Sequence, residues 1–276
     1  MSDQQRAVAA HYASDGLLDR IIGALAEVGC DPDNLEPARL TAVDQLHSRG
    51  AEGTAAQIAA FGLPAGALVL DIGAGLGGPA RTLASTDCRV VALDLTEDLM
   101  RAGAGLTARC GMTGQVIHLV GDGCRLPLCD GAFDAVWTQY ALMNVPDKTA
   151  LFAEAFRALR PGGRMCIGEP CLGSGAPLDF PVPWGTGPAL THLLAPAALR
   201  QRIERVGFHV VGWSDETAAT VDWGRRIAAR PRPANPSPLG PQLVFGSDMA
   251  LKAKNLGRAM ADGRLIEIRC IAERRG

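Results

Sequence analysis

Short apolar runs alternate along the chain with longer segments of helical character. The short runs are bounded by Gly, Pro or polar residues and predict buried strands at 67–73, 89–94, 115–122, 132–139, 164–169, 209–215 and 264–274. The segments between them predict helices at 77–85, 97–109, 147–163, 196–206, 218–230 and 247–261. Strands that alternate with helices in this way predict an α/β domain with a largely parallel sheet covered on both faces.

The first part of the chain is helical in pattern. "GLLDRIIGALAEVG" places leucines and isoleucines on one face, so we expect a helix from residue 3 to about residue 29. "CDPDNLEP" interrupts this pattern, and a further helix is expected over 50–62. These helices predict a cap over residues 1–62, ahead of a sheet domain over residues 63–276.

A glycine-rich turn follows the first predicted strand. In "VLDIGAGLGGPAR" (69–81), Gly73, Gly75 and Gly78 fit G-x-G-x-x-G between a strand and a helix. Asp94 ends the next strand, where an acid can accept hydrogen bonds from a ribose diol. This pattern is also the dinucleotide fingerprint, so the glycines alone leave two nucleoside ligands open.

Asp71 distinguishes these two ligands. A carboxylate two residues before the first glycine would repel a pyrophosphate by about 1 to 4 kcal/mol at contact range. S-adenosylmethionine has no phosphate and carries an ammonium and a sulfonium group, which a carboxylate favours. "VGDGC" ends the third strand, where Asp122 can accept a hydrogen bond from adenine beside the backbone amides of Gly123 and Cys124. The sequence therefore predicts S-adenosylmethionine as the cofactor.

Several motifs together carry a family resemblance. "VLDIGAGLGGPAR", "VALDLT", "GDG", "FDAVWTQYALMNVPDK" and "LRPGGRM" resemble the class I S-adenosylmethionine-dependent methyltransferases over about 50–170. The chain is similar to their small-molecule branch, which includes ubiquinone/menaquinone C-methyltransferases and sarcosine/dimethylglycine N-methyltransferases. The resemblance implies a Rossmann-like seven-stranded sheet, order 3-2-1-4-5-7-6 with strand 7 antiparallel. It also implies an N-terminal helical cover and lid insertions at about 170–195 and 216–262.

The resemblance also assigns expected cofactor contacts. Asp71, Gly73 and Gly75 match the residues that hold the methionine part and the ribose. The other expected contacts are Asp94 at the ribose, Leu95, Asp122 and Gly123 at adenine, Gln139 at the methionine end, and Tyr12 and Ser48, which resemble residues of the phosphoethanolamine N-methyltransferases. Those enzymes have a histidine where this chain has Asn144, so their Tyr–His dyad is missing here. Phosphoethanolamine is accordingly a poor candidate acceptor.

Methyl transfer needs alignment of the acceptor more than it needs a base. We expect Trp184 and Tyr140 to form walls of the acceptor pocket, because aromatic faces suit a sulfonium or a cationic amine. Glu169, at the end of the fifth strand, could orient an amine or act as a base. Asn144 could bond to the acceptor. Further candidates are His192 in the lid for the acceptor, and His11 and His47 in the N-terminal segment for cofactor or acceptor.

A basic cluster occurs in the second lid segment. "WGRRIAARPRP" contains Arg225, Arg226, Arg230 and Arg232. A helix with a solvated face explains these arginines, and a patch that recognises a carboxylate or phosphate substrate is the alternative.

Composition and charge narrow the partners. The 276 residues carry a net charge of −2, which provides no general attraction for nucleic acid or anionic membranes. No apolar run approaches the roughly 20 residues of a membrane helix, and the N-terminus lacks the apolar core of a signal peptide, so a cytoplasmic protein is expected. The eight scattered cysteines include no C-x-x-C pair and predict free thiols, with no metal site.

The expected function is transfer of the methyl group of S-adenosylmethionine to a small-molecule acceptor at N, O, S or C, by in-line displacement. Two alternatives stay open. One is an NAD(P)-dependent oxidoreductase on a Rossmann sheet, and the other is a nonenzymatic binder of S-adenosylmethionine. The expected partners are a small-molecule acceptor and at most a second copy of the chain, so that the protein is a monomer or homodimer.

Overall fold

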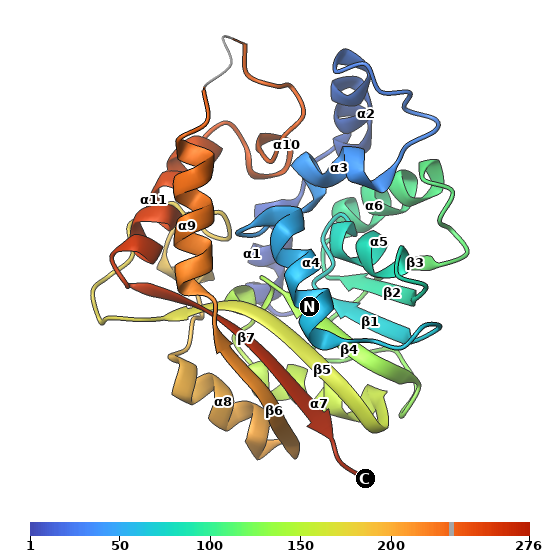
Figure 1. The fold of residues 1–276 in the computed structure, drawn as a ribbon, viewed down its shortest axis with the longest axis vertical. Helices are drawn as coiled ribbons and strands as arrows, with labels where there is room; N and C mark the ends of the chain where they lie inside the picture. Colours follow the sequence, from blue (N-terminus) through green and yellow to red (C-terminus); the bar gives the residue numbers. More distant parts are fainter. Residues whose placement is uncertain (232–234) are drawn as a thin grey trace.

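The computed structural model describes residues 1–231 and 235–276 and contains a seven-stranded sheet with helices on both faces (Figure 1). The strands are β1 (Leu68–Ile72), β2 (Arg89–Asp94), β3 (Val116–Val120), β4 (Phe133–Gln139), β5 (Leu159–Leu172), β6 (Phe208–Asp215) and β7 (Leu265–Arg274). Their order is β3-β2-β1-β4-β5-β7-β6, and β7 is antiparallel to both of its neighbours. The expected α/β Rossmann-like sheet is therefore confirmed, including its strand order.

Strand β1 lies at the centre of the sheet and is covered on both faces. Val69 and Leu70 are fully buried, and the strand pairs in parallel with β2 and with β4. A strand buried in this way needs apolar residues at nearly every position. Asp71 is the exception, because it is a carboxylic acid within this apolar layer and is only 2% exposed.

Further helices follow β1, on the two faces of the sheet and around the cavity at its carboxyl edge. They are α5 (Gly78–Ala84), α6 (Glu97–Arg109), α7 (Lys148–Ala158), α8 (Pro196–Arg205), α9 (Thr217–Ala228), α10 (Gln242–Phe245) and α11 (Met249–Ala261). Helix α5 packs over one face of β1, β2 and β4, and α7 and α8 pack over the other face. The segments expected as lids contain an irregular stretch after β5 and the helices α9 to α11 (Figure 1).

Before the sheet, the structure differs from the sequence prediction. Helices α1 (Asp3–Tyr12), α2 (Leu17–Glu27), α3 (Pro37–Asp44) and α4 (Gly50–Phe61) occur in this part. The single helix expected over 3–29 was wrong, because the chain is extended at Ala13 and left-handed at Gly16, with φ of 63°. The division lets α2 bury Ile21 and Leu25 against α6. Helix α1 takes a different direction and also contacts the segment Pro188–Leu190. Helix α3 was not expected.

The helix expected over 147–163 ends early. Helix α7 stops at Ala158, and the chain enters β5 at Leu159, which is fully buried and pairs with Phe133 of β4. Pro161 lies two residues further on and cannot continue a helix. The helix therefore ends where Leu159 packs into the sheet, several residues before the Pro161-Gly162-Gly163 sequence that was expected to end it.

A buried arginine connects the N-terminal helices to the sheet domain. Arg81 of α5 is fully buried, and its guanidinium donates to Asp44 Oδ2 of α3 at 2.8 Å. It also donates to the carbonyl of Leu76 in the glycine turn and to Thr107 Oγ1 of α6, both at 2.8 Å. A Cβ on Gly78 would lie 2.4 Å from the Asp44 carbonyl oxygen, so α3 and α5 are in backbone contact.

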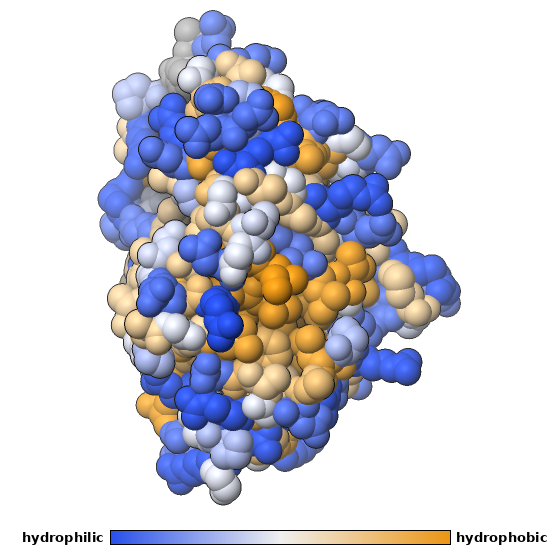
Figure 2. Space-filling model, turned by 90° about the vertical axis from the view of Figure 1, so that its right-hand side faces the viewer, coloured by the Kyte–Doolittle hydropathy of each residue, from blue (hydrophilic) through white to orange (hydrophobic). Residues whose placement is uncertain are grey.

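Strand β3 forms one edge of the sheet. Ile117 and Val120 are 61% and 48% exposed, and Figure 2 shows apolar side chains gathered on the face of the molecule that carries this edge. None of the helices in the described part of the chain has the length and apolar character needed to cross a membrane.

The Arg81–Asp44 pair should be a main determinant of stability. Replacing Asp44 by Ala leaves a buried guanidinium without its carboxylate, so we expect a loss of about 3–5 kcal/mol in the free energy of unfolding at pH 7, measured in urea. Asp130→Ala, which breaks the partly exposed pair with Arg157, is the control and should cost less than about 1 kcal/mol. Equal losses in the two variants would contradict this assignment.

Candidate functional site

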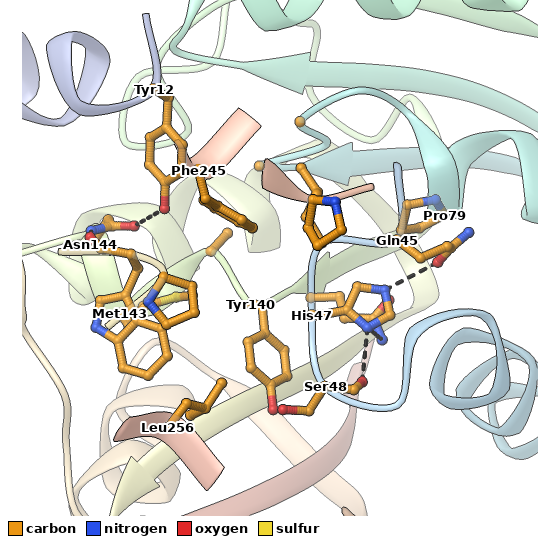
Figure 3. Close-up of a pocket in the computed structure, with 18 of the residues that line it drawn as sticks. Tyr12, Gln45, His47, Ser48, Pro79, Tyr140, Met143, Asn144, Phe245 and Leu256 are labelled. Atoms are coloured by element: carbon orange, nitrogen blue, oxygen red, sulfur yellow. Dashed lines mark hydrogen bonds between the residues drawn. The ribbon is translucent and has the colours of Figure 1, made fainter. Parts of the chain in front are cut away.

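A cavity of about 1160 Å³ opens at the carboxyl ends of β1, β2 and β4 (Figure 3). In parallel sheets this edge is where ligands bind, because the connections to the helices diverge there. The wall also includes residues of α1, the segment after α3, α9 and α11. Elements that lie far apart in the sequence thus enclose one space.

The glycine turn forms the floor of this cavity. Gly73 and Gly75 have φ of 80° and 54°, in the left-handed region that favours glycine. A Cβ on Gly73 would lie 2.2 Å from Ala141 Cβ, so the turn packs closely on the chain after β4. A Cβ on Gly75 would meet no atom within 4 Å, so the space above this residue is open to a ligand.

Two carboxylates stand at the ends of β2 and β3. Asp94 accepts hydrogen bonds from the backbone amides of Gly75 at 3.0 Å and Thr96 at 2.8 Å. Asp122 accepts one from the amide of Cys124 at 2.8 Å and one from Gln5 Nε2 of α1 at 2.5 Å. Both side chains lie on the cavity wall with their positions fixed by backbone amides.

Asp71 lies behind the cavity wall and is nearly inaccessible. Burial raises the pKa of its carboxyl to about 8, and the neighbouring carboxylate of Asp94 adds to the rise. Its Oδ2 has no hydrogen-bond partner. A buried carboxylate oxygen without a partner costs free energy, and a cation bound nearby would reduce that cost.

A polar cluster stands opposite the glycine turn. Thr54 Oγ1 of α4 donates to Gln45 Oε1 at 2.7 Å and contacts Gln139 Oε1 at 3.2 Å. His47 Nε2 lies 3.1 Å from both Gln45 Oε1 and Thr54 Oγ1. Burial lowers the pKa of His47 to about 4, so the ring is neutral at pH 7. Gln45 and Thr54 were not among the residues expected at the site, because their contacts form only once α4 packs beside the segment after α3.

Helix α1 covers the cavity and is attached to its rim. Tyr12 Oη donates to Asn144 Oδ1 at 2.9 Å, and the Asn144 amide donates to the carbonyls of Trp184 and Leu190 at 2.8 and 2.9 Å. Figure 3 shows Tyr12 and Asn144 directed toward one another. Further along α1, the ring of His11 contacts the carbonyl of Pro183 at 3.0 Å. Both amide hydrogens of Asn144 are therefore already used within the protein.

Tyr140 lies at the centre of the cavity wall. It has φ of 53°, a strained value for a residue other than glycine. Its side chain extends toward Ser48 (Figure 3), and its hydroxyl is buried without a hydrogen bond of ordinary geometry. Burial raises the pKa of Tyr140 well above its ordinary value, so the phenol is neutral.

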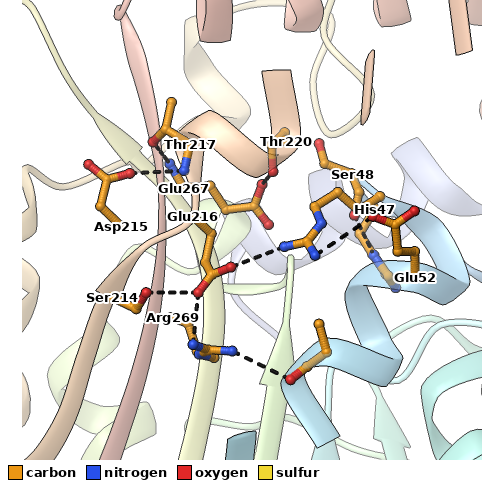
Figure 4. A network of polar contacts seen from close by, with 12 residues as sticks. His47, Ser48, Glu52, Ser214, Asp215, Glu216, Thr217, Thr220, Glu267 and Arg269 are labelled. Atoms are coloured by element: carbon orange, nitrogen blue, oxygen red, sulfur yellow. Dashed lines mark hydrogen bonds and ion pairs between the residues drawn. The ribbon is translucent and has the colours of Figure 1, made fainter. Parts of the chain in front are cut away.

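Glu267 of β7 lies behind Tyr140 and was missed in the sequence. It accepts a hydrogen bond from Thr220 Oγ1 of α9, and burial raises the pKa of Glu267 to about 7. Figure 4 shows this pair beside an ion-pair network in which Glu216 contacts Arg49 at 3.1 Å and Arg269 at 2.9 Å. An acid in the middle of the apolar run "RLIEIRCIAER" was the available signal for this network.

Most of the residues expected at the site lie on the cavity wall. These are Tyr12, His47, Ser48, Gly73, Gly75, Asp94, Leu95, Asp122, Gly123, Cys124, Gln139, Tyr140, Asn144 and Trp184. Asp71, Glu169, His192 and His11 do not lie on it. Their expected contacts with cofactor or acceptor stay predictions, and the structure shows what they touch instead.

Glu169 and His192 make contacts that shape the loops around the site. Glu169 Oε1 accepts the backbone amides of Ala141 and Leu142 at 2.7 and 2.8 Å, and burial raises its pKa to about 7. His192 Nε2 lies 2.9 Å from Gln4 Nε2 of α1. Burial lowers the pKa of His192. Glu169 therefore fixes the turn after β4, and His192 contacts the covering helix.

The charges on the cavity wall are unevenly distributed. The acidic residues on the wall are Asp44, Asp94, Asp122 and Asp147, and all of them lie in the half near the glycine turn. In the described chain this half has no lysine or arginine on its wall, and its His47 is neutral. A half-cavity of this kind favours a positively charged ligand.

Within residues 1–231 and 235–276, no cluster of His, Cys, Asp and Glu has the arrangement of a metal site. Cys124 lies on the cavity wall, where burial raises the pKa of its thiol to about 12, so it is protonated at neutral pH.

Comparisons with known proteins agree with this geometry. A family model described as a methyltransferase domain matches residues 70–167. Demethylmenaquinone methyltransferase of Thermobifida fusca (strain YX) is 36% identical over 47% of this chain and 55% of its own length. Sarcosine/dimethylglycine N-methyltransferase of Halorhodospira halochloris is 32% identical over 54% of each chain. The chain thus spans about half the length of these two curated relatives.

The likeness in fold extends further than the likeness in sequence. Geranyl diphosphate C-methyltransferase from Streptomyces coelicolor A3(2), whose crystal structure contains Mg²⁺, geranyl diphosphate and S-adenosyl-L-homocysteine, has a TM-score of 0.70 at 20% identity. The alignment covers 99% of this chain and 98% of that one, so the cap and the helices after β6 belong to the shared fold. Residues 70–167 therefore resemble a methyltransferase domain, and the chain as a whole shares the fold of a solved methyltransferase.

Proposed function

We propose that this protein transfers the methyl group of S-adenosylmethionine to a small-molecule acceptor by in-line displacement. The observation that carries the proposal is the bare glycine turn bounded by carboxylates, in a half-cavity whose described wall has no cation. When bound, the cofactor would supply an activated methyl group, and its carbon–sulfur bond would break as the bond from carbon to the acceptor forms. The acceptor loses a proton if its nucleophilic atom carries one.

The cofactor contacts are proposed as the sequence motifs suggest. Asp94 would hold the ribose diol, and Leu95, Asp122, Gly123 and Cys124 would surround adenine. Gly73, Gly75, Gln139, His47, Ser48 and Tyr12 would surround the ribose and the methionine part. Asp71 would act from behind the wall, where a bound cation would favour its ionised form. The orphaned Oδ2 of Asp71 and the open space above Gly75 support the fit.

The acceptor would bind on the other side of Tyr140. Trp184 and Tyr140 lie on the wall there and would form an aromatic boundary for the reacting methyl group. We propose that Asn144 and Glu169 position this boundary, because their polar atoms bind backbone groups nearby. His192 would act in the same way through α1. Residues 1–62 would form a cap, and the segments 170–195 and 216–262 would form the lid.

The competing functions have less support. An NAD(P)-dependent oxidoreductase would place a pyrophosphate in a half-cavity lined by Asp94, Asp122 and Asp147, which electrostatics disfavours. A nonenzymatic binder would share the cofactor site, so detection of a methylated product is needed to exclude it. We further propose a cytoplasmic protein, monomeric or homodimeric, that acts on neither nucleic acid nor membranes, and the net charge of −2 supports this.

Calorimetric titration tests the cofactor assignment. S-adenosylhomocysteine should bind and NADH should not, and transfer of a labelled methyl group to members of a metabolite library should follow. Asp94→Ala should weaken S-adenosylhomocysteine binding by about 10-fold or more, because it removes charge-assisted hydrogen bonds. Asp130→Ala, at the surface pair with Arg157, should leave binding unchanged. Binding of NADH with exclusion of S-adenosylhomocysteine would reject the proposal.

Asp71→Asn should stabilise the cofactor-free protein and weaken cofactor binding. The folded-state pKa of Asp71 is raised to about 8, so its contribution to stability is complete below pH 4 and is lost as the pH rises to 8. At pH 8 we expect the amide to raise the free energy of unfolding by an amount on the order of 2 kcal/mol. S-adenosylmethionine should stabilise the variant less than it stabilises the wild type.

Asp134→Asn provides the control with the opposite sign. Hydrogen bonds from the Leu68 amide and from Arg160 lower the pKa of Asp134, so its contribution is present at neutral pH and is lost on acidification. This variant should be less stable at pH 8. If Asp71→Asn also lost stability at pH 8, the carboxylate would have a stabilising partner and its assignment would be wrong.

The cover formed by α1 should control release of the cofactor product. Tyr12→Phe removes the hydrogen bond to Asn144, worth about 1 kcal/mol, so S-adenosylhomocysteine should dissociate about fivefold faster in stopped-flow experiments. Arg6→Gln changes the same helix at an exposed pair with Asp3 and should leave the rate unchanged. An unchanged rate in Tyr12→Phe would show that α1 does not retain the ligand.

A further inference from the structure

The cavity is larger than one cofactor requires. Its volume of about 1160 Å³ exceeds the usual range for a single small ligand, which is about 300–1,000 Å³. The part away from the glycine turn is enclosed by α9, α10, α11 and the loop that holds Trp184. If the proposed function holds, this second half receives the methyl acceptor. The chemistry of its wall then indicates the chemical class of the acceptor.

The second half is apolar over most of its surface. Its side chains are aliphatic, aromatic or thioether groups from five separate segments: Met143, Trp184, Val221, Phe245, Leu256 and Met260. Figure 3 shows Met143, Phe245 and Leu256 directed toward the same space as Tyr140. Burying an apolar body against such a wall contributes about 25 cal/mol for each Å² removed from water. The acceptor should therefore be mainly hydrocarbon in this part.

The charges of this half have the opposite sign from those near the glycine turn. Among its described wall residues, the charged ones are Arg225 of α9 and Lys254 of α11, and no acidic residue accompanies them. Both side chains are exposed at the margin of the cavity. One end of the cavity therefore suits a cation and the other end suits an anion.

These two cations differ from the basic residues beside them. Arg226 pairs with Glu52 at 2.9 Å and with Asp222 at 3.3 Å, and Lys252 pairs with Asp248 at 2.9 Å. Within the part of the chain that the structure describes, neither Arg225 nor Lys254 has a carboxylate within 4 Å. Of the arginines that the sequence grouped here, Arg230 is exposed, and Arg232 lies outside the described residues.

We propose that the methyl acceptor is an amphiphilic anion, with an apolar body between α9 and α11 and a carboxylate or phosphate group at Arg225 and Lys254. The inference rests on the proposed function and makes it more specific. A divalent ion prefers carboxylate and other oxygen ligands, and the described wall of this half has no carboxylate, so the two cations bind the anion directly.

The test uses matched probes on the full chain. Decanoate, decyl phosphate, decan-1-ol and decyltrimethylammonium share one apolar chain and differ in the head group. Calorimetry below their micelle concentrations, with and without saturating S-adenosylhomocysteine, measures binding of each. Both anions should bind about tenfold or more tightly than the alcohol, and the cation should bind most weakly. Whichever anion binds more tightly distinguishes carboxylate from phosphate.

Three variants separate this site from general surface charge. Arg225→Gln and Lys254→Gln should each weaken binding of the anions about three- to tenfold and leave the alcohol unchanged. Arg226→Gln is the matched control, one residue along the same helix, and should have no effect. Equal affinity for decanoate and decan-1-ol would overturn the proposal, as would an equal effect of Arg225→Gln and Arg226→Gln.

The same titrations keep the two proposals apart. S-adenosylhomocysteine binding without any anion preference rejects the amphiphilic anion and leaves methyl transfer standing. Anion preference without S-adenosylhomocysteine binding rejects methyl transfer and retains the anion site. Because the probes are measured in both states of the protein, each result decides one of the two proposals.

Discussion

The buried ion pair between Arg81 and Asp44 is the interaction on which the surroundings of the site depend. The guanidinium also binds the Leu76 carbonyl in the glycine turn and Thr107 in α6. One charge therefore joins α3, the glycine turn and α6. Removing either partner of a buried ion pair leaves the other charge uncompensated, which lowers the stability of the folded protein strongly. The segment after α3, which carries His47, is thereby held opposite the glycine turn.

The positions of charge connect the sequence to the chemistry. Acidic residues stand at the ends of β1, β2 and β3. Because these strands are parallel, their carboxyl ends meet at one edge of the sheet and bring the acids together. Neutral His47 leaves that part of the wall without a positive charge, while the cations of α9 and α11 stand at the other end. A cationic donor and an anionic acceptor placed in these halves would also attract one another, which brings the reacting groups together.

The sequence predicted the sheet and many residues that line the half-cavity near the glycine turn, for local reasons. A strand, a glycine turn and an acid at fixed spacing are short-range signals, so β1, Gly75 and Asp94 were recoverable without an alignment. The break at Gly16 was not, because an apolar face continues across it and only packing of α2 on α6 reveals two helices. Glu267 was missed for a similar reason: it meets Thr220 only after β7 returns to the centre of the sheet.

Tyr140 brings backbone strain into the wall of the site. The chain turns sharply there so that the following amides reach Glu169, and the left-handed conformation costs a bulky residue about 1 kcal/mol or more. Glycine would adopt this turn with little strain, yet it would remove the aromatic ring that separates the two halves. Removing a packed aromatic side chain costs roughly 3–5 kcal/mol, which exceeds the strain that glycine would relieve. Selection for stability and selection for the shape of the cavity therefore both retain tyrosine at this turn.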